Sequence, residues 1–256
     1  MERIVYSKEI EALLTKHKVF SRPSTTEHRW SVGKDFLMVP KDICIEPYTG
    51  FLVGNVLFSI GSFSYTRSIL PVHTKVGRYS SIAPGVSVMG INHPIDRFTT
   101  SSLTYSFNSI TYNTYLKDNG LEFPPVPSPK VSVKPLIIGN DVWIGSNVTF
   151  SSKGIKVNDG AVIAANTVVT KDVPPYSVVA GNPGKIVKYR FTPTIIEELQ
   201  NLNWWEYEYG KFKDISSNEP IESFIKKMKK QIVYEEIKKY NPKNCIFYST
   251  LLDKCY

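Results

Sequence analysis

The chain has 256 residues, of which 42% are hydrophobic and 21% charged, and its formal net charge is +8. This length suits one large domain, or one domain with an appendage, and the hydrophobic content excludes wholesale disorder. Much of the excess positive charge lies late, at residues 226–230 and 238–239. We interpret it as the solvated face of a helix, so no nucleic-acid partner is predicted.

The hydropathy of the chain and its cysteines indicate the cellular compartment in which the protein is expected. No apolar run approaches the roughly 20 residues of a membrane span, so no transmembrane segment is predicted. Residues 1–6 lack the apolar region of a secretory signal. Cys44, Cys245 and Cys255 are odd in number and widely spaced, which argues against a disulfide framework and a zinc site. We therefore predict a cytoplasmic location and no bound metal.

Residues 1–57 are predicted to form an N-terminal extension of mixed structure. A short helix is expected over 8–18, because Ile10, Leu13 and Leu14 fall on one side of it. An additional coil or sheet is indicated by four apolar residues in the second half of the extension: Ile43, Ile45, Phe51 and Leu57.

A six-residue period dominates residues 58–191, in two blocks separated by residues 89–137. The predicted anchors are Phe58, Ser64, Leu70, Val76, Ile82 and Val88 in the first block, and Ile138, Ile144, Phe150, Val157, Ile163 and Val169 in the second. A helix would repeat near 3.6 residues and an alternating strand near 2, so neither explains the pattern. One additional residue separates Phe150 from Val157.

The period has a simple physical interpretation. A short strand turns a corner every six residues, its anchor points into a prism-shaped core, and small residues or glycine occupy the corners. Each coil pairs with the edge of the previous one, so the core is continuous. The alternative is an all-β sandwich with accidental spacing, which two separate blocks with the same period disfavour.

The segments outside the repeat have a different character. Residues 89–137 form a long insertion whose many aromatic residues favour an ordered, packed loop. Residues 192–256 are predicted to be a C-terminal helical extension. Thr194 and Glu197 fit a capping box, and a second helix is expected from about residue 220 to 240.

His93 is the candidate catalytic residue, because it lies where the regular repeat gives way to the long insertion. The ordinary pKa of histidine is close to working pH, so an imidazole at the edge of a rigid scaffold is well placed for proton transfer. The residues alone favour the alternative, a loop histidine that only bonds to backbone.

Six segments together resemble the hexapeptide-repeat, left-handed β-helix acyltransferases. They are 81–85 (Ser-Ile-Ala-Pro-Gly), 90–96 (Gly-Ile-Asn-His-Pro-Ile-Asp), 138–145, 168–176, 180–185 and 203–205 (Asn-Trp-Trp). The combination is similar to the xenobiotic acetyltransferase branch, which includes the streptogramin and hexapeptide-type chloramphenicol acetyltransferases. Many surface-polysaccharide O-acetyltransferases look related. The likeness spans roughly residues 58–210.

The resemblance implies an all-β solenoid, a left-handed parallel β-helix with a long inserted loop and C-terminal α-helices. It implies that residues 58–191 are the catalytic domain and that His93 is the general base. The base would take a proton from an acceptor hydroxyl, which then attacks the thioester of acetyl-CoA directly. A nearby carbonyl or carboxylate should orient the imidazole, and Asp96 is one candidate. The family's sites lie between subunits, so a homotrimer is expected.

The resemblance also implies contacts to acetyl-CoA as co-substrate. The matching positions are Trp143, Ser146, Ala165, Thr170, Lys171, Lys185 and Arg190. Ser146 and Ala165 match positions where the coil backbone meets the pantetheine arm, and Lys185 and Arg190 would lie near the adenosine phosphates. Lys171 and Lys185 as solvated corner lysines, and Trp143 as a packing residue, stay open as alternatives.

Two departures from the family concern the coils: the additional residue within 150–156, and Ala165-Asn166 where a glycine is common. Three functions remain in view. The first is acetylation of a sugar hydroxyl in a bacterial surface polysaccharide or its precursor, which the aromatic-rich insertion favours. The second is acetylation of an antibiotic. The third is a non-enzymatic β-helix scaffold whose basic helix binds an acidic partner.

Overall fold

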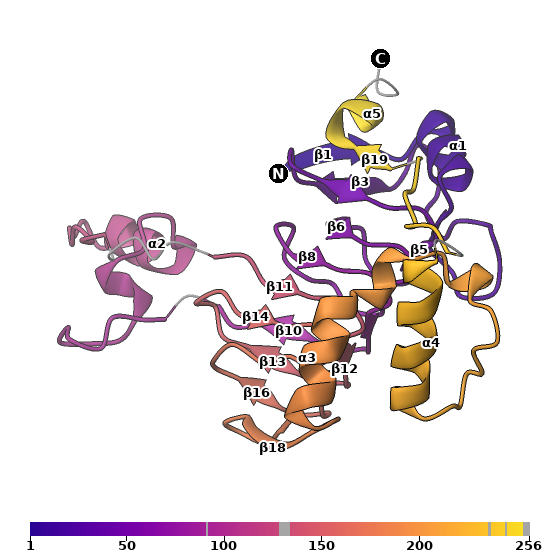
Figure 1. The fold of residues 1–256 in the computed structure, drawn as a ribbon. Helices are drawn as coiled ribbons and strands as arrows, with labels where there is room; N and C mark the ends of the chain where they lie inside the picture. Colours follow the sequence, from indigo (N-terminus) through magenta and orange to yellow (C-terminus); the bar gives the residue numbers. More distant parts are fainter. Residues whose placement is uncertain (91, 128–133, 235–236, 244, 253–256) are drawn as a thin grey trace. The chain divides into compact units, whose positions relative to one another are not determined.

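The computed structural model describes residues 1–90, 92–127, 134–234, 237–243 and 245–252 (Figure 1). They belong to two compact units. Residues 1–88 and 134–256 form the coil unit, and residues 89–133 form the inserted unit. In the part of the chain that is described, no helix is both long and apolar enough to cross a membrane.

The N-terminal extension of the coil unit contains a helix beside a two-stranded antiparallel sheet. Its elements are β1 (Glu2–Val5), α1 (Lys8–Lys16) and β3 (Phe36–Val39), which pairs with β1. The Ser7 hydroxyl accepts a hydrogen bond from the backbone N–H of Ile10 (3.3 Å) and caps the first turn of α1. Ile10, Leu13 and Leu14 are buried. The helix predicted over 8–18 is therefore confirmed.

Short parallel strands form three sheets in the coil unit. The first sheet contains β2 (Val19–Phe20), β5 (Thr49–Phe51), β7 (Tyr65–Thr66), β9 (Ser81–Ile82), β12 (Trp143–Ile144), β15 (Val162–Ile163), β17 (Ser177–Ala180) and the antiparallel β18 (Lys185–Tyr189). The second contains β4 (Cys44–Ile45), β6 (Ser59–Ile60), β8 (Lys75–Val76), β11 (Ile137–Ile138), β14 (Lys156–Val157) and the antiparallel β19 (Ile246–Phe247). The third contains β10 (Ser87–Val88), β13 (Thr149–Phe150) and β16 (Val168–Val169).

The order of these strands along the chain describes a coil. From β8 to β16 the chain visits the second, first and third sheets in a repeating order (Figure 1). Each strand pairs in parallel with the strand one coil away, as β12 does with β9 and β15. The predicted parallel arrangement of hexad strands is therefore present. The earlier coil predicted before residue 58 is present as β4 and β5.

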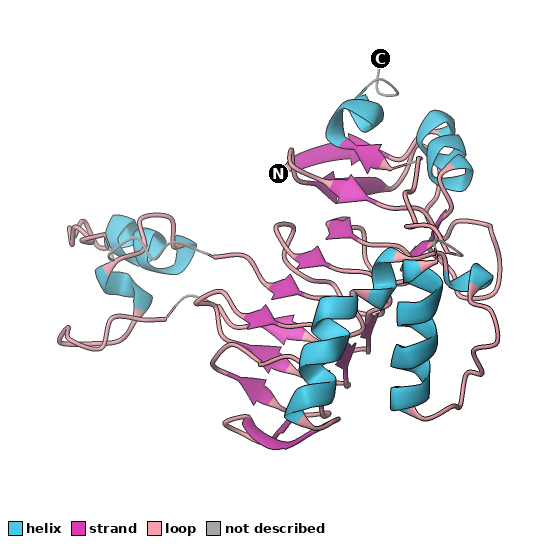
Figure 2. Ribbon diagram, in the orientation of Figure 1, coloured by secondary structure: helices cyan, strands magenta, loops and turns pink. Residues whose placement is uncertain are grey.

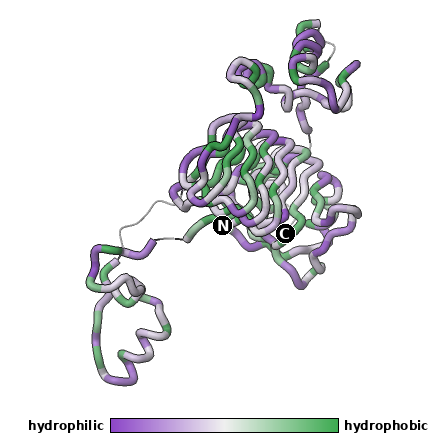
Figure 3. Tube along the Cα trace, turned by 90° about the horizontal axis from the view of Figure 1, so that it is seen from below, coloured by the Kyte–Doolittle hydropathy of each residue, from purple (hydrophilic) through white to green (hydrophobic). Residues whose placement is uncertain are grey.

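Hydrophobic residues recur at neighbouring positions of successive coils, where Figure 3 shows them in green, and the buried ones form the core. In the second sheet, a column of five buried residues runs through register-paired strands: Ile45, Ile60, Val76, Ile138 and Val157. Each coil thereby removes apolar surface from water. All six anchors predicted in the second block of the repeat are buried and lie in strands.

The first half of the first block has a different phase from the predicted one, whereas Val76, Ile82 and Val88 lie in strands as predicted. Ile60 and Thr66 occupy the strand positions. The predicted anchors Phe58, Ser64 and Leu70 are buried between the strands instead. The prediction was wrong there because the coil that follows Ile60 is two residues shorter than three hexads.

The corners absorb both departures from the regular repeat. Asn166, at the corner where glycine was expected, has a φ of 61°, and Asn147 at the neighbouring corner has 59°. Asparagine tolerates this left-handed region better than most residues, so the missing glycine is accommodated. The longer segment between Phe150 and Val157 turns at Gly154, whose φ is 78°.

The inserted unit has hydrogen bonds and helices of its own. It contains the 3-10 helix η1 (Ser102–Thr104) and α2 (Ile110–Asp118). The Arg97 guanidinium donates to the backbone carbonyls of Thr104 (2.6 Å), Val126 (2.9 Å) and Pro127 (3.2 Å), so it joins distant parts of the insertion. The aromatic-rich insertion is therefore ordered over its described residues.

The C-terminal extension is mainly helical (Figure 2). Its elements are α3 (Pro193–Leu202), η2 (Trp204–Glu206), η3 (Tyr209–Lys211), α4 (Ile221–Val233) and α5 (Tyr248–Leu252). The cap of α3 is Thr192, whose hydroxyl accepts from Ile195 N–H (3.5 Å), so the capping box predicted at Thr194 was wrong. Pro193 suits the first helical position, which shifts the cap to the residue before it. The α4 helix ends at Val233, earlier than predicted, and residues 235–236 lie outside the described part.

Candidate active site

His93 lies in the inserted unit, exposed to solvent and held by two neighbours. Its Nδ1 is 2.7 Å from the backbone carbonyl oxygen of Thr100. The same nitrogen is 3.0 Å from the phenol oxygen of Tyr105, whose ring meets the imidazole edge-on at 5.7 Å and 90°. Thr100 and Tyr105 therefore fix the orientation of the ring.

These contacts assign the tautomer of the neutral imidazole. A carbonyl oxygen only accepts hydrogen bonds, so Nδ1 must carry the proton and donate it to Thr100. The phenol oxygen of Tyr105 then acts as a second acceptor for the same N–H. It follows that Nε2 bears a lone pair, which is the form that a general base requires.

A carbonyl or a carboxylate was predicted to orient His93, with Asp96 as one candidate. The structure shows a carbonyl, that of Thr100, and the other hydrogen bond that it gives to the ring is with Tyr105. A backbone carbonyl leaves no trace in a sequence, because every residue has one. Tyr105 is one of the aromatic residues of the insertion, for which the sequence predicted only packing.

Three of the proposed cofactor residues lie at or just before one corner of the coils, between the first and third sheets. Trp143 points outward from β12 with 60% of its surface exposed. Ser146 and Ala165 occupy equivalent corner positions of neighbouring coils, and the carbonyl oxygen of Ser146 accepts from the N–H of Asn166 (2.9 Å). A Cβ on Gly145 would lie 2.6 Å from the nitrogen of Ala165, so glycine allows the close approach of the two coils.

Thr170 and Lys171 lie at the other end of β16 from Ala165, and both are exposed. Lys185 begins β18 directly after Gly184, whose N–H donates to the carbonyl of Val168 in β16 (2.8 Å). Neither ammonium group has an ion-pair partner among the described residues. Both charges are thus available to an anion.

Arg190 is already engaged within the protein. Its Nη1 donates to Asp141 Oδ2 (2.8 Å) and to the carbonyl of Gly160 (2.7 Å), and its guanidinium lies 5.3 Å from the rings of Tyr176 and Phe191. Burial raises the pKa of Asp141, against the opposing effect of the Arg190 charge. These contacts give Arg190 a structural task, so it is the weakest of the predicted phosphate contacts.

Cys44 and Cys245 are the cysteines within the described residues. No cluster of three or more histidine, cysteine or acidic side chains there suits a metal ion. Cys44 and Cys245 are free thiols. Burial, and then the neighbouring Cys44, raise the pKa of Cys245 to about 11, which keeps it protonated at neutral pH. Cys255 lies outside the described residues.

Comparison with known proteins matches the coils to a described repeat family. The family described as "Hexapeptide repeat of succinyl-transferase" matches residues 135–171. A "Probable macrolide acetyltransferase" of Lysinibacillus sphaericus is 36% identical over 166 residues, which are 61% of this chain and 84% of that protein. The galactoside O-acetyltransferase of Escherichia coli K12 is 30% identical over 66% of this chain and 71% of that protein. A chloramphenicol acetyltransferase of Klebsiella aerogenes is 49% identical over 30% of this chain and 36% of that protein.

Proposed function

The chain belongs to the hexapeptide-repeat acetyltransferases, and on that premise we propose that it acetylates a sugar hydroxyl of a bacterial surface polysaccharide or its precursor. It is an acyltransferase, and acetyl-CoA is its co-substrate. The proposal includes a left-handed winding of the coils and a homotrimer with the reaction between subunits. A cytoplasmic location stays a prediction.

His93 is the proposed general base. Its Nε2 takes the proton of the acceptor hydroxyl as the hydroxyl oxygen bonds to the thioester carbonyl carbon. A backbone N–H stabilises the tetrahedral oxyanion, which collapses with cleavage of the carbon–sulfur bond. The leaving thiolate of CoA then takes the proton from the imidazolium. The observation that carries this role is the Nδ1 contact to the carbonyl of Thr100, because it leaves Nε2 as the basic nitrogen.

The proposed cofactor contacts lie on the coils. Trp143, Ser146 and Ala165 would flank the pantetheine arm, where exposed backbone and an aromatic face suit a thin, partly polar chain. Thr170 with Lys171, and Lys185, would meet the phosphates, which the unpaired lysine charges support. We omit Arg190 from this set, because Asp141 and Gly160 already hold its guanidinium.

Two acceptor classes have support. Galactoside O-acetyltransferase supports a sugar, as do the aromatic residues of the inserted unit, since carbohydrate sites combine aromatic faces with small polar groups. The macrolide acetyltransferase, which this chain matches over more of that protein's length, supports an antibiotic as the second candidate. A scaffold without catalysis is the remaining alternative.

One assay separates these three functions. The protein is incubated with acetyl-CoA and a panel of sugars, nucleotide sugars, macrolides and chloramphenicol, and acetylated products are identified by mass spectrometry. We expect a sugar product, with turnover at least ~100-fold lower in His93→Ala. A product from the antibiotics alone would reject the sugar acceptor. Unchanged turnover in His93→Ala would reject the general base, and no product from any acceptor would favour the scaffold.

A further inference from the structure

A groove of about 510 Å³ lies in the coil unit, between the N-terminal extension and the first coils. One side is the segment 22–26, and the floor is formed by the end strands β2, β5 and β7 of the first sheet. The N-terminal extension builds much of this groove. Its volume suits a ligand of one or two sugar rings.

The floor of the groove follows from strand register. Phe20, Gly50 and Tyr65 are successive partners in β2, β5 and β7, so they lie in one row across the strands. Gly50 has no side chain, and it lies between the two aromatic residues in this row, next to Leu52. A Cβ there would lie 3.0 Å from the Cβ of Tyr65, so a larger residue would crowd the floor. The floor of the groove therefore has an aromatic residue on each side of Gly50.

An aromatic pair forms another part of the lining. Tyr48 and Phe63 are stacked with ring centroids 5.9 Å apart and planes 9° from parallel. Both have a left-handed backbone, with φ of 62° and 65°, and 48% of Tyr48 stays exposed. Holding an aromatic residue in this strained conformation costs free energy, and here it places an exposed ring beside the groove.

The charges of the groove have one sign. Arg22 and Arg67 line it, both are exposed, and neither has an ion-pair or hydrogen-bond partner for its guanidinium among the described residues. The described lining contains no acidic residue, while several hydroxyl groups are present, Thr25 and Ser24 among them. Two unpaired guanidinium groups beside aromatic faces suit a ligand that combines a ring with an anionic group.

We propose that this groove binds an anionic saccharide, with sugar rings against Tyr48 and Tyr65 and the anionic group near Arg22 and Arg67. The inference rests on the proposed sugar acceptor, and it makes the groove a holding site for the acidic part of that glycan. The anion is a uronic carboxylate or a sugar phosphate, which share the guanidinium contacts.

Binding is measured by calorimetry, without acetyl-CoA, so that the result does not depend on acetyl transfer. The probes are tri-galacturonate, glucose 1-phosphate and the neutral maltotriose. We expect at least one anionic probe to bind at least 10-fold more tightly than maltotriose, and the tighter anion identifies the group. The anionic affinity should fall as salt increases. Equal affinity for maltotriose, or no binding of either anion, would overturn the proposal.

Variants locate the site. The double variant Arg22→Gln/Arg67→Gln should lose at least 10-fold in affinity for the anion, and Tyr48→Asn should weaken binding while keeping a residue that tolerates positive φ. The charge-matched control is Lys34→Gln/Lys117→Gln, which removes two exposed lysines outside the groove and should bind as the wild type does. Undiminished binding in both groove variants would overturn the proposal. Binding without acetyl transfer would reject only the proposed function.

Discussion

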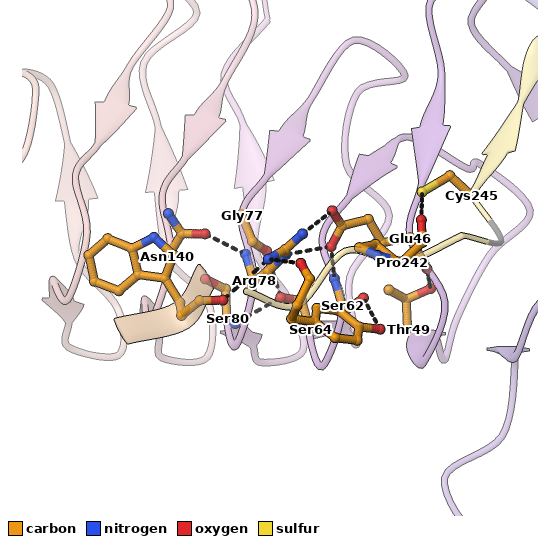
Figure 4. Close-up of polar contacts among 12 residues, drawn as sticks. Glu46, Thr49, Ser62, Ser64, Gly77, Arg78, Ser80, Asn140, Pro242 and Cys245 are labelled. Atoms are coloured by element: carbon orange, nitrogen blue, oxygen red, sulfur yellow. Dashed lines mark hydrogen bonds and ion pairs between the residues drawn. The ribbon is translucent and has the colours of Figure 1, made fainter. Parts of the chain in front are cut away.

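Arg78 and Glu46 form a bidentate ion pair between different coils, with Nε to Oε2 and Nη2 to Oε1 both at 2.7 Å (Figure 4). Glu46 also accepts from the N–H of Ser62 (2.8 Å), which lies in the coil between them. The remaining Nη1 of Arg78 donates to the carbonyls of Trp205 and Tyr240, each at 3.3 Å. One guanidinium group thus joins the coils to the C-terminal extension.

Loss of Arg78 should destabilise the protein markedly. In Arg78→Met the carboxylate of Glu46, only 19% exposed, keeps its burial and loses its counter-charge. We expect a fall of about 3 kcal/mol in the free energy of unfolding, measured with denaturant. The control is Lys41→Met, which breaks a pair whose side chains are 70% and 42% exposed and should cost at most about 0.5 kcal/mol. Equal effects of the two variants would contradict a structural role for the Arg78 pair.

The same ion pair should make the free energy of unfolding depend on pH in the acidic range. Burial alone raises the pKa of Glu46, but the hydrogen bonds and charge of Arg78, together with Ser62, outweigh it and leave the pKa below its ordinary value. A lowered pKa in the folded state stabilises the fold above the unfolded pKa, and this contribution is lost as the pH falls through the folded pKa. The Glu46→Gln variant has no carboxyl group to titrate at this position. Between pH 6 and pH 3, its free energy of unfolding should therefore fall less than that of the wild type. The difference should be roughly the contribution of one paired carboxylate. Parallel pH profiles of the two proteins would refute the linkage.

Tyr105 should act as a positioning residue for His93. In Tyr105→Phe the Nδ1 proton keeps its contact to the carbonyl of Thr100, and only the second acceptor is lost. One neutral hydrogen bond contributes about 1 kcal/mol, so turnover should fall about five-fold, far less than in His93→Ala. The acidic limb of the pH–rate profile should also shift, which a merely structural role would not cause. A loss as large as that of His93→Ala would instead make Tyr105 a catalytic residue.

Gly160 should be intolerant of a side chain. Its φ is 68°, and a Cβ there would lie 2.3 Å from Cε1 of Tyr176, a ring that is almost fully buried. We expect Gly160→Ala to lower the free energy of unfolding by about 3 kcal/mol, through strain and overpacking together. Gly210→Ala, where no atom lies within 4 Å of the added Cβ, should change it by less than about 1 kcal/mol. Similar thermal midpoints for the two variants would contradict this prediction, because they would show that the coil corner accommodates the added methyl group beside Tyr176.

Local pattern was sufficient where the repeat is regular. The anchors from Ile138 to Val169 are buried in strands as predicted. In a regular repeat, the spacing of the apolar residues is enough to show which position of each hexad faces the core. The helix at 8–18 was visible for the same reason, from the spacing of Ile10, Leu13 and Leu14. The resemblance of the motifs to hexapeptide-repeat acyltransferases is confirmed by the relatives.

Local pattern failed where coils differ in length. Phe58, Ser64 and Leu70 continue the period, yet Ile60 and Thr66 form the strands. Ser64 can be buried between strands because its hydroxyl donates to the backbone carbonyl of Gly77, 2.6 Å away. Its position in the six-residue period therefore did not reveal that it lies outside the strands. Which residues pair is decided by the neighbouring coil and not by the hexad itself.

The residue types alone determined that this chain repeats in hexads, since the spacing of apolar residues can be counted in the sequence. The prediction that His93 is the general base came from the resemblance to the acyltransferases. Only the tertiary structure decided that the carbonyl of Thr100 orients His93, and that Gly50 lies between Phe20 and Tyr65 on the floor of a groove. Backbone groups are the same in every residue, and strand register depends on coil length, so both become visible only when distant segments are brought together.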